Sequence, residues 1–169
     1  MRIAVIGYSG AGKSTLSEEL GRRYGIPVLH LDRVQFTSNW GERDRGEAHA
    51  MVAEFMERPD WVIDGNYNNF DQQRRLVLAD QVLFLNVSRL TCLGRVWRRY
   101  RRFRGGTRPD MSDGCIEKLD AEFLWWVLWK GRAGDRRRHY RDIVREYPEK
   151  TVELRGRRAL DRYLEGLTC

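Results

Sequence analysis

The chain has 169 residues, of which 41% are hydrophobic and 33% charged, a composition typical of one globular domain and not of a disordered segment. No apolar run approaches the roughly 20 residues that cross a bilayer, and the apolar stretch at the N-terminus is too short for a signal peptide. The cysteines at 92, 115 and 169 stand far apart and lack zinc spacing, so we expect a cytoplasmic protein with reduced thiols.

The formal net charge is +7, and arginine supplies nearly all of the positive charge, because lysine occurs only at positions 13, 118, 130 and 150. Guanidinium groups bind phosphate through paired hydrogen bonds, so the excess favours phosphorylated ligands or a nucleic-acid backbone. A GC-rich genome would produce the same excess. The local clustering of the arginines therefore has to decide between these interpretations.

Short apolar runs alternate with amphipathic segments along the chain. The runs predict strands at 2–6, 27–31, 61–65, 81–87 and 151–154. Helices are expected at 14–24, 46–57, 88 to about 100, 116–130, 135–146 and 158–167, and the glycine- and arginine-rich segment 101–114 reads as a mobile excursion. The alternation predicts one α/β domain over 1–169, with a five-stranded parallel sheet between two helical layers and ligands beyond the strands' carboxyl ends.

Residues Gly7 to Ser14 fill every fixed position of the P-loop pattern, with a predicted strand before them and a predicted helix after them. Glycines let successive backbone N–H groups turn inward around an anion, and the helix N-terminus adds its dipole. Lys13 is expected to reach the β- and γ-phosphates and Ser14 to bind Mg²⁺. We therefore expect ATP and Mg²⁺ as cofactors, in a cradle formed by Gly7, Ser9, Gly10, Ala11, Gly12, Lys13, Ser14 and Thr15.

The P-loop alone does not separate kinases from GTPases and motor ATPases. The short chain favours a small kinase, and no Asn-Lys-x-Asp run is present to read guanine. The fourth predicted strand ends without an aspartate, so Asp64 at the end of the third is the best candidate to hold the Mg²⁺ hydration shell opposite Ser14. The alternative is that Asp64 serves a tight turn before Gly65.

Several of these segments resemble adenylate kinases. Asp64-Gly65 is similar to the start of their Asp-Gly-Phe-Pro-Arg segment, residues 92–102 resemble the helix that enters their lid, and Gly131-Arg132 with 136–138 resembles the helix that leaves it. The whole chain resembles the topology modulation protein family of adenylate kinase-like P-loop proteins. The stretches that carry this resemblance are 7–15, 28–32, 43–44, 61–67, 107–110 and 122–126. It implies a nucleotide-kinase-like fold with a helical, arginine-rich lid at about 101–116, although the family name describes a regulatory phenotype and no substrate.

The acceptor side departs from adenylate kinases. Asn66-Tyr67-Asn68-Asn69 follows Gly65, so the arginine that would hold an acceptor nucleotide's phosphate is absent. Asp32, at the end of the second predicted strand, is expected to orient an acceptor hydroxyl or take its proton, or else to serve as a cap or turn residue. Further acceptor contacts are expected from Trp40, Arg43, Asn66 and Tyr67.

The arginines around the lid are expected to close on the phosphates, where they would neutralise developing charge and exclude water. Arg95 is assigned to the cofactor, and Arg99, Arg104, Arg108 and Arg132 to catalysis together with Lys13 and Asp32. These residues predict transfer of the γ-phosphoryl group of MgATP to a nucleotide, a nucleoside or another small molecule with a hydroxyl group.

The alternative is a nucleotide-dependent DNA-binding or DNA-topology regulator with little kinase turnover, because aromatic residues interleave with the basic ones. Against it, Phe123, Trp126 and Val127 fall at helical spacing, so most tryptophans of this region are expected in the core. His30, inside a predicted strand, is expected to be packed and hydrogen-bonded. Cys115 is the only cysteine near the lid, which excludes a zinc-bound lid of the four-cysteine kind.

Overall fold

A computed structural model describes residues 1–108 and 110–167. Its five strands form one parallel sheet in the order β2-β3-β1-β4-β5. The strands are β1 (Arg2–Gly7), β2 (Val28–His30), β3 (Trp61–Asp64), β4 (Gln81–Leu85) and β5 (Thr151–Leu154). Ile3 of β1 pairs with Val62 on one side and Gln81 on the other. The predicted α/β class with a five-stranded parallel sheet is confirmed.

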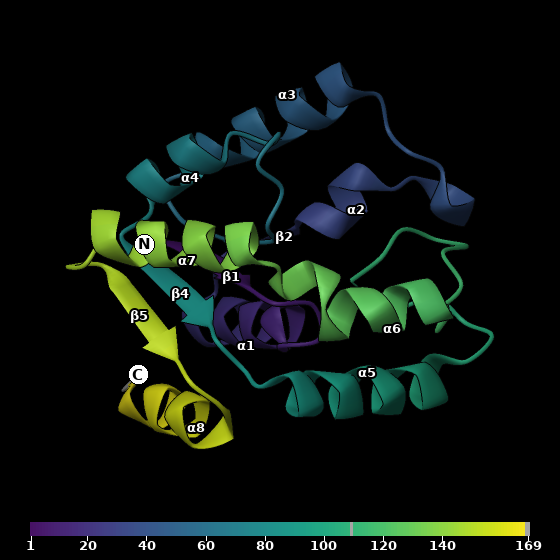
Figure 1. Cartoon of the computed structure of the whole chain (residues 1–169). Helices are drawn as coiled ribbons and strands as arrows, with labels where there is room; N and C mark the ends of the chain where they lie inside the picture. Colours follow the sequence, from purple (N-terminus) through teal and green to yellow (C-terminus); the bar gives the residue numbers. More distant parts are fainter. Residues whose placement is uncertain (109, 168–169) are drawn as a thin grey trace.

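The helices cover both faces of this sheet. They are α1 (Lys13–Tyr24), α2 (Leu31–Gln35), α3 (Arg45–Met56), α4 (Gln72–Leu78), α5 (Arg89–Phe103), α6 (Ala121–Leu128), α7 (Gly134–Glu146) and α8 (Arg157–Gly166), with 3₁₀ turns η1 (Ser38–Trp40) and η2 (Lys130–Arg132). Helices α1 and α8 lie on one side of the sheet, and α3, α4 and α7 on the other (Figure 1). Among the described residues, no helix is both long and apolar enough to cross a membrane.

The central strands are buried because helices cover both of their faces. Every residue of β3 and all of β1 after Arg2 are buried, as the continuous apolar runs in the sequence predict. Because β1 and β3 pair in register from Arg2 with Trp61 to Val5 with Asp64, their carboxyl ends meet at one edge of the sheet. This register brings the P-loop beside Asp64.

Helix α6 corrects two sequence predictions. It begins at Ala121 and not at 116, because the Asp120 carboxylate accepts a 2.7 Å hydrogen bond from the backbone N–H of Phe123 and caps the helix. It ends at Leu128, and Trp125 and Trp129 stack on each other at 4.6 Å while 56% and 49% exposed. The expectation that most tryptophans of this region are core is therefore wrong.

Two short helices, α2 and α4, were not predicted, and the segment expected to be a mobile excursion is folded against the residues that follow β2. We call residues 104–118 the lid segment. It contains a bridge between Thr107 and Ile116, and it docks on the segment after β2, where the Ile116 carbonyl accepts a 3.1 Å hydrogen bond from Trp40 Nε1. The hydroxyl of Ser112 donates to the carbonyl of Phe36. Pro109, within the motif 107–110, lies outside the described residues.

Candidate functional site

A hollow of about 1870 Å³, here called the nucleotide cleft, opens at the carboxyl edge of the sheet. Its walls come from the P-loop and α1, from α2 and the segment after it, from the loop after β3, from α5 and the lid segment, and from parts of α6, α7 and α8. The sequence-predicted residues that line it are Ser9, Gly10, Gly12, Lys13, Ser14, Thr15, Asp32, Trp40, Asp64, Asn66, Tyr67, Arg95, Arg99 and Arg108.

The P-loop has the geometry that its sequence predicts. Gly10 and Gly12 adopt φ angles of 76° and 95°, which favour glycine. A Cβ atom on Gly10 would also come within 2.7 Å of the Val96 side chain on α5, so the loop and α5 pack too closely for a larger residue. The Lys13 ammonium donates a 3.2 Å hydrogen bond to the Gly7 carbonyl, and the Arg95 guanidinium donates to the Ala11 carbonyl. Two cationic side chains thus flank the loop that is expected to hold phosphates.

Asp64 is buried at the end of β3 and shares a hydrogen-bonded chain with His30 and Glu18. His30 Nδ1 lies 2.8 Å from Asp64 Oδ1, and Nε2 lies 2.6 Å from Glu18 Oε1. Burial alone would lower the pKa of His30, but the hydrogen bonds and negative charges of the two carboxylates outweigh it and raise the pKa to about 9. His30 is therefore a protonated histidine that fixes the Asp64 carboxylate, and its predicted packed, hydrogen-bonded state is confirmed.

The residues at this edge fit a magnesium ion. Asp64 uses one oxygen for His30, and within the described part of the chain neither its second oxygen nor the Ser14 hydroxyl makes a side-chain hydrogen bond. Both groups line the nucleotide cleft. Carboxylate and hydroxyl oxygens are the hard ligands that Mg²⁺ takes alongside phosphates and water.

Asp32 lies in the first turn of α2, directly after β2, and accepts a 2.7 Å hydrogen bond from the Tyr67 hydroxyl. Burial first, and then the charge and hydrogen bond of Asp32, raise the pKa of Tyr67 far above its usual range. Tyr67 therefore remains a donor at neutral pH. It orients one carboxylate oxygen of Asp32. The sequence predicted both residues as acceptor contacts but not the hydrogen bond between them.

The loop after β3 is tied to the P-loop and to α4. The Asn66 amide binds both backbone groups of Gly7, accepting from its N–H at 3.1 Å and donating to its carbonyl at 2.6 Å. The buried guanidinium of Arg75 donates to the carbonyls of Phe70 at 2.9 Å and Tyr67 at 2.6 Å. Burial lowers the pKa of Arg75 to about 10. Arg75 was missed because no pattern in the sequence marks which arginine of a short helix points inward.

Glu117 organises the lid arginines and was also missed. Its buried carboxylate accepts a 2.8 Å hydrogen bond from Arg99 Nε, and its other oxygen lies 2.7 Å from Arg108 Nε in an ion pair. Arg108 also pairs with Asp110 at 3.3 Å. Burial, and then the neighbouring charge of Arg108, lower the pKa of Arg99. The single carboxylate thus holds one arginine of α5 and one of the lid segment at the wall of the cleft.

Five predicted residues do not line the nucleotide cleft. Gly7 and Ala11 form the back of the P-loop, and Arg43 is engaged by the Val34 carbonyl at 2.9 Å and by Glu47. Arg104 is exposed at the C-terminal end of α5. Arg132 is buried on the far side of the P-loop, where it donates to the Val87 carbonyl at 2.6 Å and lies 3.8 Å from the Tyr8 ring centre. Contrary to expectation, these arginines are not gathered around the cleft.

Known proteins resemble this chain in sequence and in fold. No protein-family model matches the chain. A protein of Thermococcus onnurineus (strain NA1) described as "Putative adenylate kinase" is 26% identical over 160 residues, which are 90% of this chain and 81% of that protein. The structure of a shikimate kinase from Acinetobacter baumannii in complex with shikimate matches with a TM-score of 0.60 and 20% identity over 98% of this chain and 90% of that one.

An uncharacterized protein from Eubacterium ventriosum matches with a TM-score of 0.55 and 16% identity, over 99% of this chain and 96% of that one. At these identities the structural likeness shows the fold alone. The chain therefore has a kinase-like P-loop fold.

Proposed function

We propose that the protein transfers the γ-phosphoryl group of MgATP to a hydroxyl group of a small acceptor. The observation that carries the proposal is that the P-loop and Asp32 line the same hollow, in which Tyr67 holds Asp32. Arginines of α5 and of the lid segment line this hollow as well. The kinase-like fold and the kinase name of the Thermococcus relative support this class of reaction.

The residues divide the work in the following way. The P-loop N–H groups and Lys13 bind the phosphates, and Ser14 and Asp64 hold the magnesium, which neutralises phosphate charge when bound. The free oxygen of Asp32 orients the acceptor hydroxyl or takes its proton. Arg95, Arg99 and Arg108 supply positive charge where negative charge develops during transfer. The other three arginine assignments made from the sequence receive no support from their positions.

The acceptor side favours a neutral acceptor with hydroxyl groups. A phosphate-bearing acceptor is best held by a free guanidinium, but Arg43, the arginine expected to contact the acceptor, is bound by Val34 and Glu47. Asn66, which stands where adenylate kinases continue toward their arginine, is engaged by Gly7. We therefore place nucleosides and small hydroxylated metabolites ahead of nucleoside monophosphates.

The test is transfer of label from γ-labelled MgATP to three pools: nucleosides, nucleoside monophosphates and small hydroxylated metabolites. Label in one pool, lost in the Lys13→Ala variant, would establish a kinase and its acceptor class. Tight ATP binding without transfer to any pool would contradict the proposal. Label confined to monophosphates would contradict the acceptor class alone.

A second candidate function has one observation in its favour. The stacked pair Trp125–Trp129, at the C-terminal end of helix α6, is about half exposed, and α6 packs against the arginine-rich helix α5. Exposed aromatic rings in a basic setting are what single-stranded nucleic acids stack on. The resemblance to the topology modulation protein family points the same way. This candidate, a nucleotide-dependent DNA-binding regulator, requires DNA binding with a steep salt dependence, weakened by Trp125→Ala. Affinity unchanged by that substitution would remove the support.

A further inference from the structure

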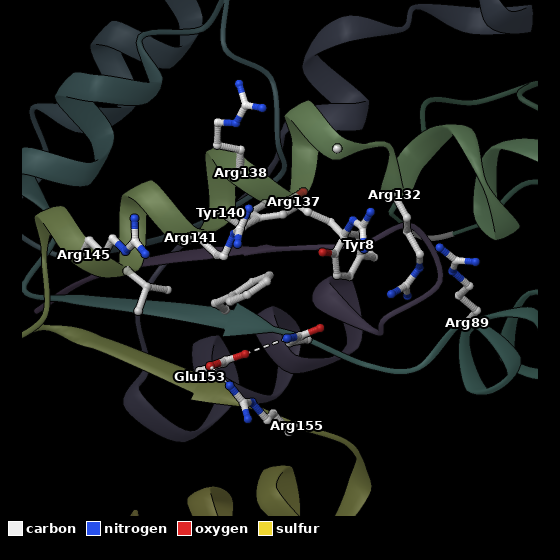
Figure 2. Close-up of a pocket in the computed structure, with 14 residues that line it drawn as sticks. Tyr8, Arg89, Arg132, Arg137, Arg138, Tyr140, Arg141, Arg145, Glu153 and Arg155 are labelled. Atoms are coloured by element: carbon white, nitrogen blue, oxygen red, sulfur yellow. Dashed lines mark hydrogen bonds and ion pairs between the residues drawn. The ribbon is translucent and has the colours of Figure 1, made fainter.

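A second hollow, of about 840 Å³, lies on the opposite side of the P-loop, between α7 and the carboxyl ends of β4 and β5 (Figure 2). We call it the arginine hollow. Its described lining residues and those of the nucleotide cleft do not overlap. Seven arginines and a single glutamate line it, namely Arg89, Arg132, Arg137, Arg138, Arg141, Arg145, Arg155 and Glu153. Such a ratio of charges sets it apart from an ordinary solvated surface.

The arginines come from three sides of the hollow. Arg137, Arg141 and Arg145 repeat every four residues along α7, so they share one face of the helix at intervals of about 6 Å along its axis. Arg89 stands at the start of α5 and Arg155 directly after β5, on the other sides of the same space (Figure 2). Guanidinium groups thus surround a concavity instead of forming a flat basic face.

Most of these arginines have no partner to balance their charge. Within the described residues, the side chains of Arg89, Arg137, Arg138, Arg141 and Arg145 make no hydrogen bond or ion pair. The acidic residues of α7 do not line the hollow, and one of them, Glu146, accepts a hydrogen bond from Gln73. Arg132 is only 8% exposed. Its Nη2 donates a hydrogen bond to the Val87 carbonyl, but its Nε has no hydrogen-bond partner among the described residues. Like charges gathered in this way repel each other unless an anion binds between them.

The floor of the hollow is aromatic but closed. Tyr140 stacks on Phe84 at 4.7 Å and meets Tyr8 edge-on at 5.1 Å, and none of the three rings is more than 6% exposed. No ring on the floor is therefore free to stack a base. At one side Asn86 donates a 2.6 Å hydrogen bond to Glu153, which gives the floor a polar pair able to recognise hydroxyl groups.

We propose that the arginine hollow is a second phosphate-binding site, which takes a small ligand carrying two or more phosphate groups. Its volume lies in the range of about 300–1,000 Å³ that small-molecule sites occupy. Arginine binds phosphate oxygens through its paired N–H groups, and three guanidiniums at regular intervals match several phosphates better than one. A nucleic-acid strand fits less well, because the hollow is concave and lacks a stacking platform.

The site touches the back of the P-loop, so a ligand here would act close to the nucleotide without entering its cleft. Arg132 packs over Tyr8, the second residue of the P-loop, and the Tyr140 hydroxyl donates a 3.3 Å hydrogen bond to the Gly7 carbonyl. The neighbouring Arg136 faces the other way and lies 4.4 Å from the Trp126 ring centre at the nucleotide cleft. Binding in the arginine hollow does not depend on the proposed kinase activity.

The experiment is calorimetric titration of inorganic tripolyphosphate into the Lys13→Ala protein, in which binding at the P-loop is weakened. Two charge-reversed variants are compared in this background. Arg141→Glu with Arg145→Glu removes two exposed arginines of the hollow. Arg45→Glu with Arg158→Glu, which are exposed and line neither hollow, makes the same change in net charge elsewhere.

We expect tripolyphosphate to bind the Lys13→Ala protein at one site, at least tenfold more weakly in the Arg141/Arg145 variant and about equally in the Arg45/Arg158 control. Thermal melting checks that all three proteins fold. An equal loss in both variants, or no loss in either, would overturn the site. Binding of a single-stranded oligonucleotide but not of tripolyphosphate, lost in the Arg141/Arg145 variant, would also overturn it and assign the hollow to nucleic acid.

Discussion

Asp32 is the residue on which the chemistry of the proposed kinase depends. Tyr67 orients one of its oxygens, and the other is available to the acceptor in the nucleotide cleft. We expect Asp32→Asn to lower kcat at least a hundredfold, because the amide can neither accept a proton nor hold the hydroxyl in the same way. The affinity for MgATP should change less than twofold, since the phosphates contact the P-loop.

Tyr67→Phe is the matched control for Asp32, because it keeps the carboxylate and removes only its orienting hydrogen bond. We expect Tyr67→Phe to lower kcat by about tenfold, less than Asp32→Asn does. Steady-state kinetic assays of both variants measure the difference. A large loss of MgATP affinity in Asp32→Asn would instead make Asp32 a magnesium or structural residue.

His30 gives the fold a dependence on pH that can be measured without any substrate. Its pKa is about 9 in the folded protein and 6.5 in the unfolded chain, so its protonation stabilises the fold. This contribution, at most about 3 kcal/mol, is complete below pH 6.5 and is lost as the pH rises through 9. Urea unfolding in EDTA should therefore show the free energy of unfolding falling over this range, and His30→Gln should flatten the fall. Equal slopes for both proteins would rule out a protonated His30.

At the scale of the elements, the position of the lid segment is held by the carboxylate of Glu117, near the end of this segment. Glu117 is buried and joins Arg99 of α5 to Arg108 of the lid segment. Glu117→Gln would leave Arg99 without a charged partner and Arg108 with only its contact to Asp110. We expect a loss of about 3 kcal/mol in the free energy of unfolding. Limited trypsin digestion should cut within 101–108 faster than in the wild type. Asp110→Asn, which removes the longer contact of Arg108 at 3.3 Å, should leave the digestion nearly unchanged.

The elements also show how much of the structure could be predicted from the sequence. The five strands were predictable because buried parallel strands consist of short apolar runs. The P-loop was predictable because its glycines and Lys13 follow a fixed spacing. The start of α6 at Ala121 was not, because residues 116–120 carry a helical pattern while Glu117 finds its arginine partners only in the folded chain. Arg132 was misplaced for the same reason, since the side of the P-loop on which the turn η2 places Arg132 depends on how the folded chain packs.

At the scale of the whole molecule, the described residues form two basic hollows on either side of one P-loop. The nucleotide cleft contains carboxylates at Asp32 and Asp64 as well as arginines, as the proposed transfer from MgATP to a hydroxyl group requires. The arginine hollow has only Glu153, and so offers binding without an evident reaction.

Ligand binding should be visible as stability of the whole domain. A ligand present at 100 times its Kd stabilises the folded state by about 2.7 kcal/mol, which for a domain of this size raises Tm by about 5 to 10 °C. We expect this shift with MgATP in the wild type and in the Arg141→Glu/Arg145→Glu variant, because neither arginine lines the nucleotide cleft. Lys13→Ala should reduce it, because the P-loop then binds the phosphates more weakly. Differential scanning fluorimetry measures the shift in Tm. The difference between the shift with MgATP and the shift with ATP in EDTA is the part that requires magnesium. A shift that survives Lys13→Ala but disappears in the Arg141/Arg145 variant would mean that ATP binds in the arginine hollow, and the P-loop assignment would then fall.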